Sequence, residues 1–93
     1  MNKLEELRKN IDQIDDNIIK LFIERMDVVK EVIAYKIENN IPILDSSRES
    51  KMVEKNMNKV RKEEYKKYYI SILEGFLKAS KDLQKDILES HKN

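Results

Sequence analysis

The sequence of 93 residues contains no cysteine, one glycine and one proline. Without cysteine, the chain can form no disulfide and no cysteine-ligated metal site. So little glycine and proline leaves few residues for tight turns, which argues against a fold of many β-strands. No stretch of the chain approaches the ~18 consecutive apolar residues that a membrane helix requires. We therefore expect a helical chain that makes no contact with a membrane.

The chain also lacks a large excess of either positive or negative charge. Nineteen basic and eighteen acidic residues leave a formal net charge of +1. A nucleic-acid-binding protein normally has a basic excess, so this balance argues against a nucleic-acid partner. The N-terminal segment 1–6 is acidic and amphipathic, so we expect no signal peptide and a cytoplasmic protein. Although 40% of the residues are charged, another 40% are hydrophobic and spaced periodically, which favours a packed protein over disorder.

The most regular feature present is an apolar stripe in the N-terminal part of the chain. Its members recur at alternating steps of three and four residues, with one step missing: Leu4, Leu7, Ile11, Ile14, Ile18, Leu21, Val28 and Val32. This spacing predicts a long α-helix that continues to about Glu38. Asn2 and Glu5 form a variant of the capping box at its start, and Pro42 disfavours helix at Ile41.

Two further helices are expected in the remainder of the chain. The second should begin near residues 45–47, where Ser46 and Glu49 have the spacing of a capping box. The third follows a join near residues 61–64 that no glycine or proline marks. We therefore predict an all-α fold of three helices in a single domain that covers residues 1–93.

The length of the first helix predicts a dimer. About 36 residues at 1.5 Å each extend roughly 54 Å, whereas a compact chain of this size has a radius of gyration near ~12 Å. One compact chain cannot cover so long a stripe, so we expect an intertwined homodimeric helical bundle. The alternative is a helix broken near Arg25 that folds back as a monomeric bundle, although no glycine or proline stands there.

Several polar residues occupy positions where the period requires an apolar one. Arg25 stands at the missing step of the stripe, where burying its charge is costly unless an anion pairs with it. Lys36 lies about 20° away around the same helix and ~16 Å along it, so the two cations could grip one small anion. Ser80 and Gln84 stand on the apolar face of the third helix, where polar groups need hydrogen-bond partners.

Each of these residues also has an ordinary structural interpretation. Arg25 could pair with a buried glutamate or set the register of a dimer, and Lys36 could be a solvated lysine. The two polar residues of the third helix could form routine hydrogen bonds within a bundle. Glu49 could merely cap the second helix, and Asp45 could be its N-cap. Taken one residue at a time, the pattern leaves these alternatives open.

Taken together and in order, the polar residues resemble the AroQ class of all-helical chorismate mutases. The resemblance covers nearly the whole chain, and all eight positions in order are far more specific than any one alone. The matching motifs are Leu7-Arg8 with Ile11-Asp12-x-Ile14-Asp15, Glu24-Arg25 before a valine-rich stretch, Lys36, Asp45-x-x-Arg48-Glu49 after Pro42, and Ser80-x-x-x-Gln84.

The resemblance implies an isomerase that converts chorismate to prephenate in the shikimate pathway of aromatic amino acid biosynthesis. The reaction is a [3,3] pericyclic rearrangement, for which the family needs no cofactor and no metal. Arg8 and Arg25 would bind the two carboxylates. The planar guanidinium of arginine can form two parallel hydrogen bonds to a carboxylate, which the ammonium group of lysine cannot. Lys36 and Gln84 would be the catalytic residues, donating to the ether oxygen where negative charge develops. Lys36 would also contact a carboxylate.

The resemblance assigns the remaining matched positions to substrate binding. Glu49 would receive the ring hydroxyl of chorismate, with Asp45 close by at the start of the second helix. Arg48 would add positive potential, and Ser80 would support a carboxylate. These assignments come from the family and not from the spacing of the residues.

Arg8 provides an independent argument for a shared site. It stands 28 residues before Lys36, roughly 42 Å along one helix, so the two cannot touch one small ligand from the same chain. In the family, each of two sites borrows this arginine from the partner chain. The helix length and the site therefore predict the same homodimer.

Two other functions fit part of the pattern. An isochorismate pyruvate-lyase has the same fold and keeps counterparts of the cationic positions and of Gln84, but the lyases lack the Arg48-Glu49 pair. The second alternative is a non-catalytic helical dimerisation module, which would not require arginine at the matched positions. Fifteen of the nineteen basic residues are lysine, yet three of the four arginines occupy matched positions.

Overall fold

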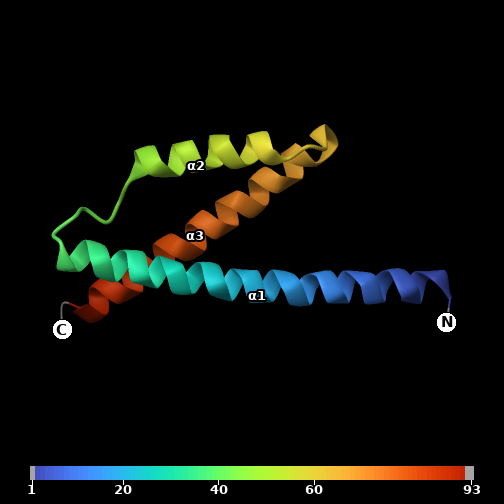
Figure 1. Ribbon diagram of the computed structural model, residues 1–93, viewed down its shortest axis with the longest axis horizontal. Helices are drawn as coiled ribbons and strands as arrows, with labels where there is room; N and C mark the ends of the chain where they lie inside the picture. The colour runs from blue at the N-terminus through green and yellow to red at the C-terminus, as the bar shows by residue number, and fades with distance from the viewer. Residues whose placement is uncertain (1, 92–93) are drawn as a thin grey trace.

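A computed structural model describes residues 2–91 as three α-helices and one short 3-10 helix (Figure 1). The elements are α1 (Lys3–Glu38), α2 (Ser46–Lys59), η1 (Glu63–Tyr65) and α3 (Lys66–His91). Within these described residues there is no β-strand, and the all-α prediction is confirmed. No helix in this part of the chain combines the length and the apolar character needed to cross a membrane.

The start of α1 follows the sequence prediction. The side chain of Asn2 accepts a hydrogen bond from the backbone N–H of Glu5 over 2.9 Å. This bond satisfies one of the donors that have no partner in the first turn of a helix. The helix then continues without interruption past Arg25. The alternative of a helix broken at that position is therefore wrong.

The end of α1 is closed by a left-handed residue. Asn40 has a φ of 57°, and asparagine tolerates this conformation better than most residues other than glycine. The backbone N–H of Ile41 donates to the carbonyl of Lys36 over 2.8 Å, and that of Asn40 to Ile37 over 3.3 Å. These two bonds form a Schellman motif, which ends the helix at Glu38, four residues before Pro42.

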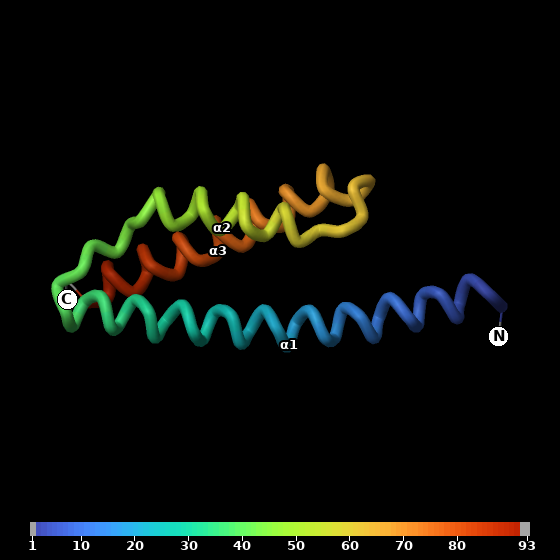
Figure 2. The backbone as a smooth tube through the Cα atoms, turned by 45° about the horizontal axis from the view of Figure 1, so that its top comes forward, coloured from blue at the N-terminus to red at the C-terminus, as the bar shows by residue number. Residues whose placement is uncertain are grey.

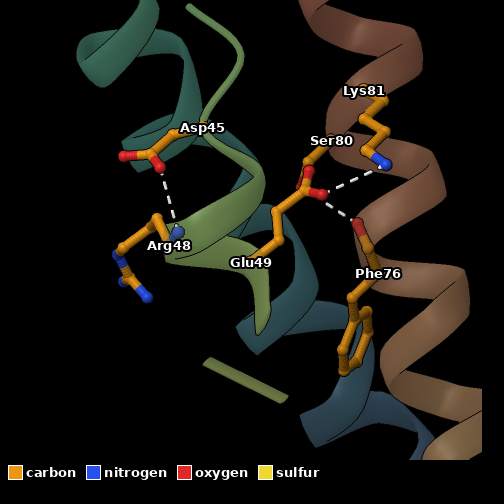
Figure 3. Close-up of polar contacts among 6 residues, drawn as sticks. All are labelled: Asp45, Arg48, Glu49, Phe76, Ser80 and Lys81. Atoms are coloured by element: carbon orange, nitrogen blue, oxygen red, sulfur yellow. Dashed lines mark hydrogen bonds and ion pairs between the residues drawn. The ribbon is translucent and has the colours of Figure 1, made fainter. Parts of the chain in front are cut away.

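Helix α2 begins within the predicted residues 45–47, but its cap differs from the predicted capping box. Asp45 is the N-cap, because its Oδ1 accepts a hydrogen bond from the backbone N–H of Arg48 over 3.0 Å (Figure 3). The capping box between Ser46 and Glu49 is therefore wrong, and the interpretation of Asp45 as the N-cap is confirmed. Aspartate and serine cap helices about equally well. The backbone makes the choice, since Asp45 is extended (φ −140°, ψ 83°) and Ser46 is already helical.

The join between α2 and α3 lies where no glycine or proline marks it. The chain leaves α2 at Val60, whose backbone is extended (φ −75°, ψ 104°), and passes through η1 into α3. The join predicted near residues 61–64 falls within this segment.

Helix α3 packs against both α1 and α2 (Figures 1 and 2). It crosses the C-terminal half of α1, whereas the N-terminal half of α1 projects away from the rest of the chain. Among residues 2–91, the buried apolar side chains are Ile33 on α1 and Leu73 on α3. The core of a single chain is therefore small.

The projecting half of α1 leaves the apolar stripe in solvent. From Leu4 to Val32, the members of the stripe are 46% to 61% exposed. The accessible surface is 7926 Å², against about 5,700 Å² for a compact chain of this mass. The radius of gyration is 17.0 Å, against ~12 Å for a compact chain. A single chain thus leaves most of its apolar surface uncovered.

Candidate active site

A pocket of about 460 Å³ lies between the C-terminal half of α1, the start of α2 and the middle of α3. This volume is within the range of small-molecule sites. Its apolar walls are formed by Val28, Val29, Val32, Ile43, Met52 and Leu77. Its polar lining consists of seven of the eight matched residues: Arg25, Lys36, Asp45, Arg48, Glu49, Ser80 and Gln84. Residues far apart in the sequence therefore meet around one cavity.

Arg8 does not line this pocket. It precedes Arg25 by 17 residues on the continuous α1, which is about 26 Å along the axis. Its place on the projecting half of the helix leaves it exposed. One chain cannot bring Arg8 to the same small molecule as the other seven residues.

Arg25 is held in place by α3. Its Nη1 donates a hydrogen bond to Ser80 Oγ over 2.7 Å, and its guanidinium lies 5.4 Å from the centre of the Phe76 ring. Ser80 is 7% exposed, and its hydroxyl donates to the Phe76 carbonyl over 2.9 Å. A hydroxyl has one hydrogen, so Ser80 accepts from Arg25 while its own proton is held by Phe76. Within residues 2–91, Arg25 is thus oriented by a hydroxyl and a ring rather than by a glutamate.

Lys36 joins the end of α1 to the loop that follows. Its Nζ donates to the carbonyl oxygen of Ile43 over 3.2 Å, and the residue is half-buried. It is therefore not a freely solvated lysine. An ammonium group has three N–H donors, so the carbonyl uses one of them and a ligand in the pocket can use the others.

Glu49 reaches from α2 toward α3, whereas the side chain of Arg48 extends to the other side of α2 (Figure 3). The Oε2 atom of Glu49 lies 3.2 Å from Nζ of Lys81. Its carboxylate therefore joins two helices, and the cap of α2 is supplied by Asp45 instead. Gln84 lies one turn after Ser80 on α3 and is half-buried in the same pocket wall.

The charges around the pocket favour an anion. Three cationic and two anionic side chains line it, which leaves a formal excess of one positive charge. Among residues 2–91, no group of three or more histidine, aspartate or glutamate side chains is arranged to hold a metal ion. The available groups are thus donors for carboxylates and other oxygen atoms, together with two carboxylates. Asp45 caps α2 through Oδ1, and Glu49 can accept a hydrogen bond from a hydroxyl group.

A second depression, of about 620 Å³, lies on the surface at η1. It is lined by the six consecutive residues 63–68 alone. Because it brings together no residues from separate helices, it lacks the convergence of side chains that a ligand site requires.

Three features of the site were not anticipated from the sequence. They are the ring of Phe76 beside Arg25, the carbonyl of Ile43 on Lys36, and Lys81 on Glu49. Phe76 precedes Ser80 by one helical turn on the same apolar face, so helical spacing could have identified it. The other two contacts join different elements, and no local pattern indicates them.

Comparison with known proteins identifies one family. The family model described as chorismate mutase type II matches residues 7–85. A chorismate mutase from Methanocaldococcus jannaschii is 38% identical over 95 aligned positions, which cover 100% of this chain and 95% of that protein. No solved structure gives a significant match.

Two longer relatives match as well, both named bifunctional chorismate mutase/prephenate dehydratase. The protein from Buchnera aphidicola is 36% identical over 99% of this chain, and the match spans 24% of its own length. The protein from Aquifex aeolicus is 40% identical over 70% of this chain and 18% of its own length. In these two relatives, the chain therefore corresponds to a small part of a larger protein.

Proposed function

The chain belongs to the chorismate mutase type II family, and we propose that the pocket between α1, α2 and α3 is where it converts chorismate to prephenate. It is thus an isomerase. An ether C–O bond breaks while a C–C bond forms within one molecule, so the substrate neither gains nor loses atoms or electrons. The protein has to hold the reactive conformer and stabilise the charge that develops on the ether oxygen.

The observation that carries the proposal is the convergence of seven matched polar residues on one pocket with apolar walls. Arg25 binds one carboxylate through a guanidinium that Ser80 and Phe76 already orient. A donor held in place before the ligand arrives loses less conformational entropy on binding. Because the proton of Ser80 is held by Phe76, Ser80 supports the carboxylate through Arg25.

Of the remaining residues, some contact the reacting ether oxygen and the others act near the ring hydroxyl of the substrate. Lys36 contacts a carboxylate and, together with Gln84, donates to the ether oxygen. Gln84 is a neutral donor and Lys36 a cationic one, so they stabilise developing negative charge by donating hydrogen bonds, without a proton transfer. Glu49 accepts a hydrogen bond from the ring hydroxyl of the substrate, with Asp45 close by. Arg48 contributes positive electrostatic potential.

The second part of the proposal is an intertwined homodimer that brings Arg8 of one copy to the pocket of the other. The exposed stripe on α1 and the excess accessible surface both support a second copy over the projecting half of the helix. Charge supports the same arrangement. A pocket with one excess positive charge gains a second from Arg8, which matches a substrate with two carboxylates.

The direct test is an assay of the purified protein with chorismate. Loss of chorismate absorbance should accompany the formation of prephenate, identified by its conversion to phenylpyruvate in acid. A folded dimer that does not turn over chorismate contradicts the proposal. Isochorismate supplied in parallel tests the lyase function, and pyruvate release faster than chorismate turnover would replace the mutase by a lyase.

We also propose that the protein acts in the cytoplasm. Cell fractionation with antibody detection tests this proposal, and recovery of the protein outside the cytoplasmic fraction contradicts it.

A further inference from the structure

Lys81 forms an ion pair that differs from the others in the described chain. Its Nζ lies 3.2 Å from Oε2 of Glu49, so the pair joins α3 to α2. The other two pairs among residues 2–91 link residues three or four apart along the chain. The pair is therefore a contact that the tertiary fold creates, and one of its members lines the proposed active site.

We propose that Lys81 is a positioning residue for Glu49, holding the carboxylate in the orientation that receives the ring hydroxyl of the substrate. The inference rests on the proposed function, because it requires Glu49 to accept that hydroxyl. Lys81 itself touches neither the pocket nor the reacting atoms in this arrangement.

The positions of the two side chains support this division of labour. Glu49 lines the pocket, whereas Lys81 lines a smaller neighbouring depression of about 260 Å³. Ile43 and Gln84 border both cavities. Figure 3 shows Glu49 extended toward α3 with Lys81 approaching from that helix. Lys81 therefore reaches the carboxylate from outside the pocket through Oε2, and Oε1 is the oxygen left for the substrate.

The exposure of the pair argues that its purpose is orientation rather than stability. The side chain of Glu49 is 28% exposed and that of Lys81 is 50% exposed. Ion pairs this accessible to water contribute little to folding. However, a glutamate has three rotatable side-chain bonds, and a fixed partner restricts the rotamers that it samples. Restricting it before the substrate binds lowers the entropic cost of the productive complex.

The test uses Lys81→Met, which keeps an unbranched side chain of similar length but removes its charge. We expect a fall in kcat/KM of about three- to tenfold, the range for losing one pre-oriented side chain. Lys81→Arg should restore most of the activity, because it keeps the cation. The matched control is Lys78→Met on the same helix, whose ion pair with Asp82 is far more exposed and should leave activity unchanged.

A double-mutant cycle separates orientation from general electrostatics. If Lys81 acts through Glu49, Lys81→Met should cost nothing further in a chain that already contains Glu49→Gln. An equal loss in both backgrounds overturns the inference, since it indicates attraction of the anionic substrate by charge alone. Thermal unfolding of each variant, measured at one protein concentration, shows whether a loss of activity reflects a loss of folded protein.

The outcomes also separate this inference from the proposed function. Full activity of Glu49→Gln would contradict the proposed role of Glu49 and the inference with it. Loss of activity in Glu49→Gln together with full activity of Lys81→Met contradicts the inference alone.

Discussion

The guanidinium of Arg25 on α1 donates a hydrogen bond to the hydroxyl of Ser80 on α3 over 2.7 Å. The two residues are 55 positions apart in the sequence. The bond orients Arg25 in the lining of the pocket, and the Phe76 carbonyl in turn orients the Ser80 hydroxyl. A buried hydroxyl thus orients a cation that the proposed function requires.

Ser80→Ala should weaken catalysis through Arg25. The variant removes the acceptor of a charge-assisted hydrogen bond, which contributes about 1.5–3 kcal/mol when the partner is ionic. We expect kcat/KM for chorismate to fall by roughly tenfold, because part of that energy is recovered by water or substrate. Steady-state kinetics checks the change. Ser71→Ala, at an exposed position of the same helix, is the control and should leave kinetics unchanged.

Gln84→Glu should make activity depend on pH. The amide donates to the ether oxygen at any pH, whereas a carboxyl group can donate only when it is protonated. An ordinary glutamic acid has a pKa of about 4.3, and partial burial raises it. Activity of the variant should therefore be present at acid pH and be lost as pH rises through that pKa. A pH profile of kcat/KM measures this, and undiminished activity at a pH of about 8 would count against the role of Gln84.

Arg8→Ala and Arg25→Ala should each be inactive alone but should complement one another when mixed. After subunit exchange, each heterodimer contains one site with both arginines intact. Random exchange makes half of the dimers heterodimers, so the mixture should recover about one quarter of the wild-type activity. Activity is measured after exchange is verified by native mass spectrometry.

The control for this experiment is a mixture of Arg25→Ala with Lys36→Ala. Both residues line the same chain's pocket, so no heterodimer contains an intact site. Recovery in the control, or none in the test mixture despite verified exchange, contradicts the sharing of sites between chains.

Gly75→Ala should stabilise the protein. Gly75 lies within α3, and a methyl group at this position would meet nothing within 4 Å in the described chain. Alanine is favoured over glycine in a helix by about 1 kcal/mol, so the free energy of unfolding should rise by that amount. Denaturant titration at one fixed protein concentration measures it, with Glu74→Ala as a control that changes little. A loss of stability would indicate that a second chain fills the space beside Gly75.

Local signals in the sequence were sufficient for the helices and their faces. An apolar period with a single missing step, and no glycine or proline from residue 3 to residue 38, determines one long helix, and Asn2 caps its start. The resemblance to the chorismate mutase family then selected eight residues, of which seven lie around one pocket. The family itself is confirmed by comparison.

Local signals failed where two residues had equal propensity or where no breaker was present. Asp45 and Ser46 are both good caps, and the path of the chain out of the loop selected Asp45. The transition from α2 to η1 contains only residues that are compatible with helix, so composition indicates its position only roughly.

By itself, the sequence determined the three helices, the length of α1 and the apolar stripe that a single chain leaves in solvent. These properties depend on residues within a few helical turns of one another. Over that range, the separation of two residues in the sequence fixes their separation on the helix surface. Only the tertiary structure decided that Ser80 faces Arg25, that Lys36 bonds the Ile43 carbonyl, and that Lys81 meets Glu49. The contacts of Ser80 and Lys81 depend on how α3 crosses α1 and lies along α2, and that of Lys36 depends on the path of the loop after α1. The helical period of one segment contains no information about the position of another.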